Sequence, residues 1–273
     1  MIQRDYITEW RRNAPWPSDA QVEQDLVLSR ALVEIFQHPL LGQALAFRGG
    51  TALHKLFLPS PARYSEDIDL VQVEAGPIGG VMTALRETLD PWLGTPRRSH
   101  GEGRMTFIYR FKSELPPIVP LRLKIEVNTR EHFTVLGHVM KPFTVESRWF
   151  EGTASIRSFA IEELLATKLR ALYQRRKGRD LFDLCITLEQ GALDAAKLVA
   201  CFEEYMQRAG AVVSRAQFEE NLTKKLAMSD FAADLPQILS ATALPEFDRH
   251  AAGRTVLNEL VARLKGESWQ GQP

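Results

Sequence analysis

The sequence predicts an α+β protein in which a mixed region of strands and helices is followed by an all-helical region. Before residue 155, several short segments alternate apolar and polar residues, as half-buried strands do. From residue 160 onward, apolar residues recur instead at helical spacing. The 273 residues, 45% of them hydrophobic, are enough for one large domain or two modest ones. We therefore expect one domain over residues 1–155 and a helical C-terminal domain over 156–273.

The first domain should begin with a polar segment and a helix that starts at a capping box, Ser18–Gln21, and runs to about His38, where Pro39 stops it. A short apolar piece, 45–47, leads into Gly49–Gly50, and one or two helical turns should follow. The later elements are expected in this order: a strand over 67–73, a helix over 81–89 that Pro91 ends, strands over 104–111 and 121–128 joined by a Pro-rich loop over 112–120, and a strand over 143–150.

In the second domain, a helix should follow Ala160, because apolar residues form one stripe along it: Ile161, Leu164, Leu165, Leu169 and Leu172. Asp194 is expected to cap a helix that ends at Gly210, and Ser214–Gln217 forms a second capping box. A last helix should span 255–265, with Gly266 as its stop.

Composition excludes several classes of protein. The chain has 34 basic and 34 acidic residues, so any nucleic-acid partner must be bound by a local patch. Cys185 and Cys201 cannot form a disulfide framework, and no CxxC pair is present for zinc. No apolar run approaches the ~18 residues of a membrane span, and the N-terminus lacks the apolar region of a signal peptide. We expect a cytoplasmic protein with no membrane partner.

Two aspartates are the first candidate site residues. Asp67 and Asp69 flank Ile68 in a predicted strand, so both carboxylates should project from one face, roughly 6–7 Å apart at their Cα atoms. A divalent cation such as Mg²⁺, or Mn²⁺, would offset their repulsion, since it prefers hard oxygen ligands. Glu126, on the polar side of another predicted strand, could supply a third carboxylate. The alternative is a solvated strand face without a metal.

A glycine pair precedes these carboxylates. Gly49, Gly50 and Thr51 stand between a strand end and a helix start, where glycines allow a phosphate to approach and helix N–H groups bind anions. The segment is neither a Walker A motif nor a Rossmann fingerprint. An ordinary tight strand-to-helix turn is the alternative.

A lysine and a basic cluster complete the candidates. Lys168 falls on the apolar stripe, where its side chain either extends outward to solvent or points into a cleft. Beyond it lies a run of basic residues that is either a solvated charge run or a surface for a phosphate backbone: Arg170, Arg175, Arg176, Lys177 and Arg179.

The order of these motifs resembles a known family. The segments are GGTALHK at 49–55, RYSEDIDL at 63–70, KIEVN at 124–128, KLRAL at 168–172 and RDLFDL at 179–184. Together they resemble the AbiEii/AbiGii nucleotidyltransferase toxins, which include the MenT toxins and belong to the DNA-polymerase-β-like nucleotidyltransferase superfamily. The motifs lie within residues 47–184, about half of the chain.

The resemblance implies a polymerase-β-like mixed sheet with helices, followed by a helical domain. It would place Gly49, Gly50 and Thr51 in a triphosphate-binding loop, with Ser65 beside the site. Asp67, Asp69 and Glu126 would be the metal-binding carboxylates, and Lys168 would bind nucleotide phosphate. Asp180 or Asp183 would match the family's fourth motif, and we favour Asp180 because it directly follows an arginine.

The resemblance also implies an activity. A nucleoside monophosphate, often a pyrimidine nucleotide, would be transferred from an NTP to the 3′ end of tRNA and would block aminoacylation and translation. A two-metal site would orient the 3′-hydroxyl and stabilise the departing pyrophosphate, and a winged-helix antitoxin would be the partner. Two alternatives stay open: the same chemistry on a small molecule or a protein, and a nucleotide-binding partner module without catalysis. Ser65 is a candidate site of phosphorylation or self-modification.

Overall fold

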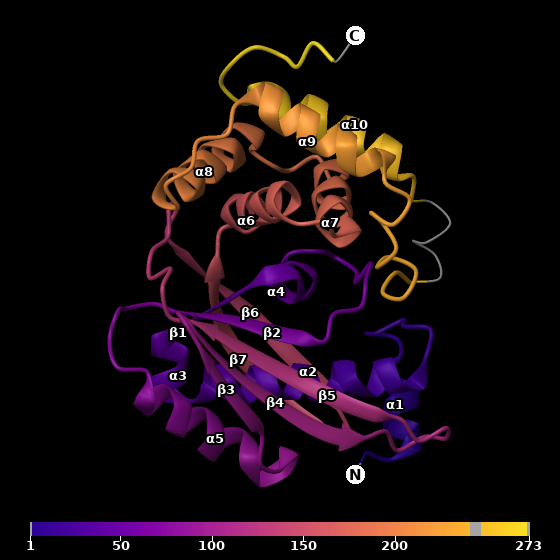
Figure 1. Cartoon of the computed structure of the whole chain (residues 1–273). Helices are drawn as coiled ribbons and strands as arrows, with labels where there is room; N and C mark the ends of the chain where they lie inside the picture. Colours follow the sequence, from indigo (N-terminus) through magenta and orange to yellow (C-terminus); the bar gives the residue numbers. More distant parts are fainter. Residues whose placement is uncertain (1, 241–246, 272–273) are drawn as a thin grey trace. The chain divides into compact units, whose positions relative to one another are not determined.

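The computed structural model describes residues 2–240 and 247–271, and its chain divides into two compact units, Met1–Phe159 and Ala160–Pro273 (Figure 1). The boundary expected near residue 155 falls inside the last strand of the first unit, which continues to Phe159. Each unit is described by itself below.

Within the described residues, unit 1 is built on a seven-stranded mixed sheet in the order β3-β4-β5-β2-β1-β7-β6 (Figure 1). Its strands are β1 Leu45–Arg48, β2 Asp67–Gln72, β3 Arg97–Gly101, β4 Arg104–Lys112, β5 Pro120–Asn128, β6 His138–Ser147 and β7 Phe150–Phe159. The pairs β2–β5 and β1–β7 are parallel, and the other neighbours are antiparallel. The α+β fold with a mixed sheet is confirmed.

The helices of unit 1 are α1 Arg4–Trp10, α2 Asp19–Gln37, α3 Pro39–Ala44, α4 Gly49–Leu56 and α5 Gly79–Leu93. The capping box that begins α2 is confirmed: the backbone N–H of Gln21 donates to the Ser18 side chain, and the backbone N–H of Ser18 donates to the Gln21 side chain. α2 is buried over most of its length, since it packs against β7, β5 and β6. It covers one face of the sheet and forms the core of the unit.

Two expectations for unit 1 are wrong. Pro91 does not end α5 but lies inside its last turn, where the missing N–H costs a single hydrogen bond, and Gly94 with φ of 78° follows the helix instead. The single strand expected over 143–150 is the hairpin of β6 and β7, whose turn falls at Arg148–Trp149. Burial alternates along β6, but its exposed side carries Met140 and Pro142 and its half-buried side carries Lys141, so the apolar alternation that reveals a strand is broken. The edge strand β3 escaped prediction because all of its residues are exposed.

Unit 2 contains α6 Ile161–Gln174, α7 Gly178–Glu189, α8 Ala195–Arg208, α9 Arg215–Ala227, α10 Arg249–Glu259 and a 3₁₀ turn, Val261–Arg263. Asp194 caps α8, and the capping box of Ser214 and Gln217 begins α9, as expected. The last helix starts at Arg249 rather than Thr255, because Asp248 caps it, and the chain then tightens into the 3₁₀ turn. Across the described ranges, no helix is long and apolar enough to cross a bilayer.

Candidate active site

The three predicted carboxylates lie on one face of the sheet in unit 1. Asp67 and Asp69 begin β2, and the parallel register places Lys124 beside Asp67 and Glu126 beside Asp69. Residues paired across neighbouring strands share a face, so the side chains of Asp67, Asp69 and Glu126 project from the same side. The structure thus brings together carboxylates that lie far apart in the sequence.

Burial disfavours the charged form of the Asp67 carboxylate. Its Oδ1 atom is buried and makes no hydrogen bond to any residue that the structure describes. Burial raises the pKa of this carboxyl, Lys124 opposes that effect, and the nearby Asp69 and Glu66 add to it. A buried acceptor without a donor is costly, so this oxygen is a place where a cation would be stabilising.

Lys124 occupies part of the carboxylate cluster. Its Nζ lies 3.0 Å from Glu126 Oε2 and 3.6 Å from Asp67 Oδ2, while Arg104 Nη1 lies 3.3 Å from Glu126 Oε1. Within the described ranges, no three His, Cys, Asp or Glu side chains converge closely enough to hold a metal ion. Glu126 therefore faces two cationic side chains rather than completing a set of three converging carboxylates.

The turn between β1 and α4 fits closely against Asp69. Gly49 has φ of +83°, and a Cβ added there would lie 2.5 Å from Asp69 Oδ2. Backbone conformation and space both require glycine at this position. Arg48, the residue before α4, makes no side-chain capping hydrogen bond, whereas Ser18 and Ser214 cap α2 and α9. The residue before α4 therefore does not satisfy the first N–H groups of this helix, which begins next to Asp69.

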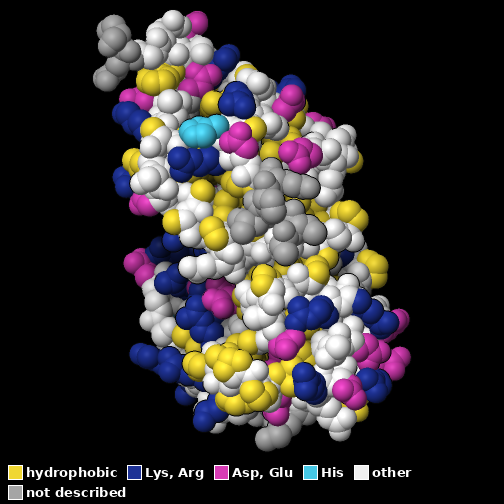
Figure 2. Space-filling model, turned by 90° about the vertical axis from the view of Figure 1, so that its right-hand side faces the viewer, with side chains coloured by type: hydrophobic (Ala, Val, Ile, Leu, Met, Phe, Trp, Pro, Cys, Tyr) yellow, Lys and Arg dark blue, Asp and Glu magenta, His cyan; other side chains and the backbone are white. Residues whose placement is uncertain are grey.

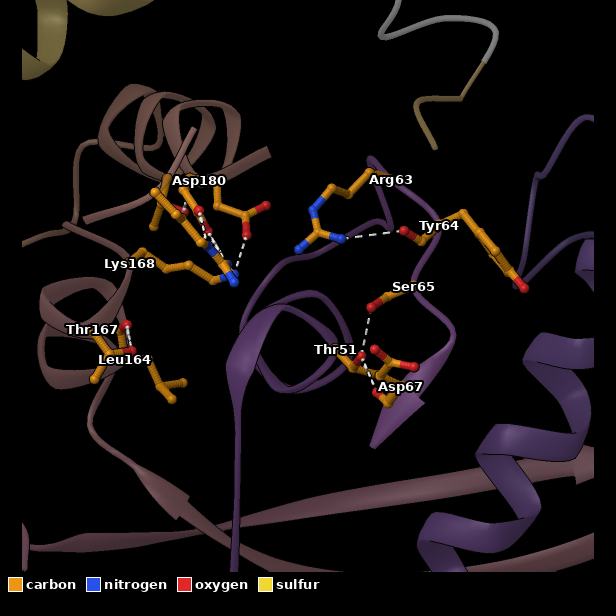
Figure 3. Close-up of polar contacts among 12 residues, drawn as sticks. Thr51, Arg63, Tyr64, Ser65, Asp67, Leu164, Thr167, Lys168 and Asp180 are labelled. Atoms are coloured by element: carbon orange, nitrogen blue, oxygen red, sulfur yellow. Dashed lines mark hydrogen bonds and ion pairs between the residues drawn. The ribbon is translucent and has the colours of Figure 1, made fainter. Parts of the chain in front are cut away.

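Thr51 and Ser65 tie this turn to the start of β2 (Figure 3). The Thr51 hydroxyl donates to the Asp67 carbonyl oxygen at 2.6 Å and lies 2.6 Å from Ser65 Oγ. Because Thr51 has a single hydroxyl proton and the carbonyl only accepts, Ser65 must be the donor to Thr51. The Thr51 hydroxyl thus links α4 to β2, and the lone pairs of Ser65 Oγ stay available to accept a hydrogen bond. Ser65 therefore contacts a side chain of the neighbouring α4 rather than local backbone.

Sequence reasoning missed two residues here. Lys124 stands two positions before Glu126 on the polar side of the same strand, but only the register between β2 and β5 places it beside Asp67. Arg63 is buried in the loop before β2 and donates to the Tyr64 carbonyl at 3.2 Å (Figure 3). A buried arginine in a loop carries no sequence signal, because arginine is usually exposed.

Lys168 in unit 2 is the centre of a buried ion cluster. Its side chain is only 9% exposed, and its Nζ lies 3.4 Å from Asp180 Oδ1 and 3.0 Å from Asp183 Oδ2 (Figure 3). Lys168 therefore does not extend to solvent. Arg175 donates to both oxygens of Asp180, at 2.7 and 2.8 Å. Burial favours a raised pKa at Asp180, but Lys168 and Arg175 hold its pKa below the usual range.

Comparison with known protein families assigns the chain to one of them. Residues 30–252 match the family described as nucleotidyl transferase AbiEii toxin, type IV TA system. The chain belongs to this family. The expected resemblance to the AbiEii family is thereby confirmed, and the protein is a nucleotidyltransferase toxin of this family.

Solved structures agree on the fold. MenT4, a nucleotidyltransferase toxin from Mycobacterium tuberculosis, is 18% identical with a TM-score of 0.69, and the match covers 97% of this chain and 91% of that chain. A putative nucleotidyltransferase from H. pylori is 18% identical with a TM-score of 0.58, over 89% of this chain and 95% of that one. A comparison with curated proteins gave no match.

Two residues of the basic run 170–179 of this AbiEii toxin are engaged in contacts within the protein. Arg170 stacks over the ring of Tyr205 at 5.0 Å, and Arg175 is engaged with Asp180. Arg176 and Lys177 are exposed, and Arg179 is half-buried. The arginine that pairs with Asp180 is thus Arg175, and not the adjacent Arg179. On the face shown in Figure 2, Lys and Arg side chains are interspersed with Asp and Glu, in keeping with the zero net charge.

Proposed function

We propose that this AbiEii toxin transfers a nucleoside monophosphate from an NTP to the 3′-hydroxyl of an RNA. The expected acceptor is the 3′ end of tRNA, and the expected donor is a pyrimidine NTP. The observation that carries the proposal is the buried, unpartnered Oδ1 of Asp67 on the same face as Asp69, beside the glycine turn that begins α4. Such a site suits the triphosphate of an NTP together with a cation.

The donor set fits a divalent metal. Asp67 and Asp69 offer hard carboxylate oxygens, and the unpartnered Asp67 Oδ1 gains a stabilising partner when a cation binds. We propose Mg²⁺ or Mn²⁺ on Asp67 and Asp69. Glu126 joins them only by exchanging its contacts with Lys124 and Arg104. When bound, the metal supplies charge neutralisation at the reacting phosphate and lowers the pKa of the attacking hydroxyl.

The chain's own groups have distinct parts in this proposal. The uncapped N–H groups at the start of α4, at Gly50 and Thr51, donate to phosphate oxygens. Gly49 lets the triphosphate approach the backbone there. Ser65, through its hydrogen bond to Thr51, holds the turn against β2 and offers its lone pairs to the nucleotide. Lys168 is proposed to neutralise charge on the β- and γ-phosphates, with Asp180 and Asp183 orienting its ammonium group.

The cellular setting is also a proposal. A toxin that blocks aminoacylation acts where translation occurs, which favours the cytoplasm. A cognate antitoxin, expected to carry a winged helix, would neutralise it. The basic residues Arg170, Arg175, Arg176, Lys177 and Arg179 stay predicted as an RNA contact, with Arg175, Arg176 and Lys177 as the exposed members.

The test is incubation of the purified protein with each α-labelled NTP, Mg²⁺ and total cellular RNA, protein and metabolite fractions in turn. Label should appear on RNA with the wild-type chain and disappear with Asp67→Ala or Asp69→Ala. Glu74→Ala, an exposed carboxylate beyond the other end of β2, is the matched control and should keep full activity. Label on protein or on a small molecule would refute the RNA acceptor, and label with Asp67→Ala would refute the site.

A further inference from the structure

One face of the strands β3, β4 and β5 carries a row of exposed cations beside the carboxylates. The register shows which residues share this face. They are the even-numbered residues of β5 (120–128), the even-numbered residues of β4 (104–112), and Arg97, Ser99 and Gly101 of β3. Asp67 and Asp69 lie on the same face, because they pair with Lys124 and Glu126. The opposite face of these strands buries Met105, Phe107, Tyr109, Leu123 and Ile125 in the core.

The charge on this face, which we call the basic face, is strongly one-sided. Its cationic residues are Arg97, Arg104, Arg110, Lys112, Arg122 and Lys124. Over the same strand positions, all of which the structure describes, Glu126 is the single acidic residue. All of these cations except the half-buried Lys124 are exposed. In a chain whose net charge is zero, such a local excess marks the binding surface of an anion.

Three of these cations are not neutralised by the protein itself. Arg104 and Lys124 pair with Glu126, and Arg122 pairs with Glu66. Arg97, Arg110 and Lys112 make no ion pair with any described residue. Arg110 also lies directly opposite Arg122 in the antiparallel register, an arrangement of like charges that costs stability unless an anion lies between them.

The position of the basic face suits a polymer that reacts at Asp67 and Asp69. Neighbouring strands are about 4.8 Å apart, so the face starts one strand from Asp69 and extends about 14 Å to the edge strand β3. We propose that the basic face holds the phosphate backbone of the RNA acceptor whose 3′ end reacts at these carboxylates. This inference rests on the proposed function and adds to it the surface that binds the acceptor.

The chemistry of the face also defines how it recognises RNA. It carries no Phe, Tyr or Trp on which a base could stack, and its free side chains are cations that contact phosphate oxygens. Binding is therefore dominated by counterion release and depends steeply on salt. In the run 170–179, by contrast, Arg175 is already engaged with Asp180 and Arg170 with Tyr205.

Arg97 and Arg98 provide a matched test, because they are adjacent, exposed residues of β3 that point to opposite faces. Affinity for deacylated bulk tRNA is measured over a salt series for the wild type, Arg97→Ala/Arg110→Ala and Arg98→Ala. Loss of two phosphate contacts should flatten the slope of log K against log salt by about 1.4 and weaken binding roughly 25-fold at 0.1 M salt. Arg98→Ala should bind as the wild type does, and NTP affinity should be unchanged in both variants.

The outcomes separate this inference from the proposed function. If the double variant and Arg98→Ala have equal RNA affinities and equal salt slopes, the basic face is not the RNA-binding surface. RNA labelling by the wild type would still support the proposed function in that case. Weaker binding by Arg175→Ala/Arg176→Ala alone would move the contact to the run 170–179 and equally overturn the basic face. Absence of RNA labelling and RNA binding in the wild type would overturn both. A melting temperature of the double variant at or above that of the wild type shows that the variant is folded, since it relieves the repulsion between Arg110 and Arg122.

Discussion

Replacing Asp67 with asparagine should stabilise the metal-free protein while it abolishes nucleotide transfer. The carboxylate is buried, one of its oxygens has no partner among the described residues, and its pKa is raised by burial. The amide keeps a polar atom at this position, so the saving comes from the charge, whose burial costs about 1–2 kcal/mol more than that of a neutral polar group. Lys124, 3.6 Å from the other oxygen, returns up to about 1 kcal/mol as a partly exposed ion pair. The neutral amide should therefore gain about 1 kcal/mol of unfolding free energy at neutral pH.

The measurement is thermal unfolding at pH 7.5 in EDTA and then in Mg²⁺. A gain of 1 kcal/mol corresponds to roughly 2–4 °C for a domain of this size. Mg²⁺ should reverse the order: at ten times its dissociation constant it adds about 1.4 kcal/mol to the wild type, and it should add little to the variant. Glu74→Gln, at an exposed carboxylate, should change neither melting temperature.

The sign of the pH dependence follows from the raised pKa of Asp67. Between the ordinary carboxyl pKa and the raised one, the folded state binds more protons than the unfolded state, so wild-type stability falls as pH rises through that window. The advantage of Asp67→Asn should thus be complete above the window and vanish below it. An asparagine variant that is less stable than the wild type in EDTA at pH 7.5 would refute the reasoning.

Three further predictions concern other parts of the molecule. Lys168→Met should weaken NTP binding roughly tenfold or more in a direct titration, and should destabilise the fold because Asp180 and Asp183 lose their buried cation; unchanged NTP affinity would make Lys168 purely structural. Ser65→Glu, which mimics a phosphate, should abolish transfer, whereas Ser65→Ala should keep most of it; full activity of Ser65→Glu would argue against a modification switch. Burial lowers the pKa of Lys225 to about 8. The free energy of unfolding should therefore increase as pH rises from 8 toward 10, because in this range the ammonium proton of Lys225 is held by the unfolded state and not by the folded state. Urea unfolding curves of Lys225→Met should lack this increase in stability.

Much of the fold was accessible from the sequence because its signals are local. The caps at Ser18, Asp194 and Ser214 are satisfied within three residues, so they locate α2, α8 and α9 without knowledge of the tertiary structure. The strand β5 has a clean alternation because one of its faces is core and the other is exposed. β3 is exposed on both faces, and in β6 the residue types do not follow the alternation of burial, so pairing with a neighbour rather than a sequence pattern defines these two strands.

The candidate site was only partly accessible. The spacing of Asp67 and Asp69 predicted a shared face, and the positive φ of Gly49 explains the glycine that begins α4. The place of Lys124 depends on the register between β2 and β5, which no local pattern contains. The bond from Arg175 to Asp180 could not be foreseen either, because it depends on the turn between α6 and α7.

The most direct test of the account is transfer to a defined RNA end. Purified wild-type protein with Mg²⁺ and a labelled pyrimidine NTP is given deacylated tRNA with an intact 3′-hydroxyl, and in parallel the same tRNA after periodate oxidation of its 3′ end. The account predicts that intact tRNA gains labelled nucleotide at its 3′ end, that oxidised tRNA gains none, and that Asp69→Ala labels neither. Equal labelling of both tRNAs, or of neither while another acceptor is labelled, would contradict it.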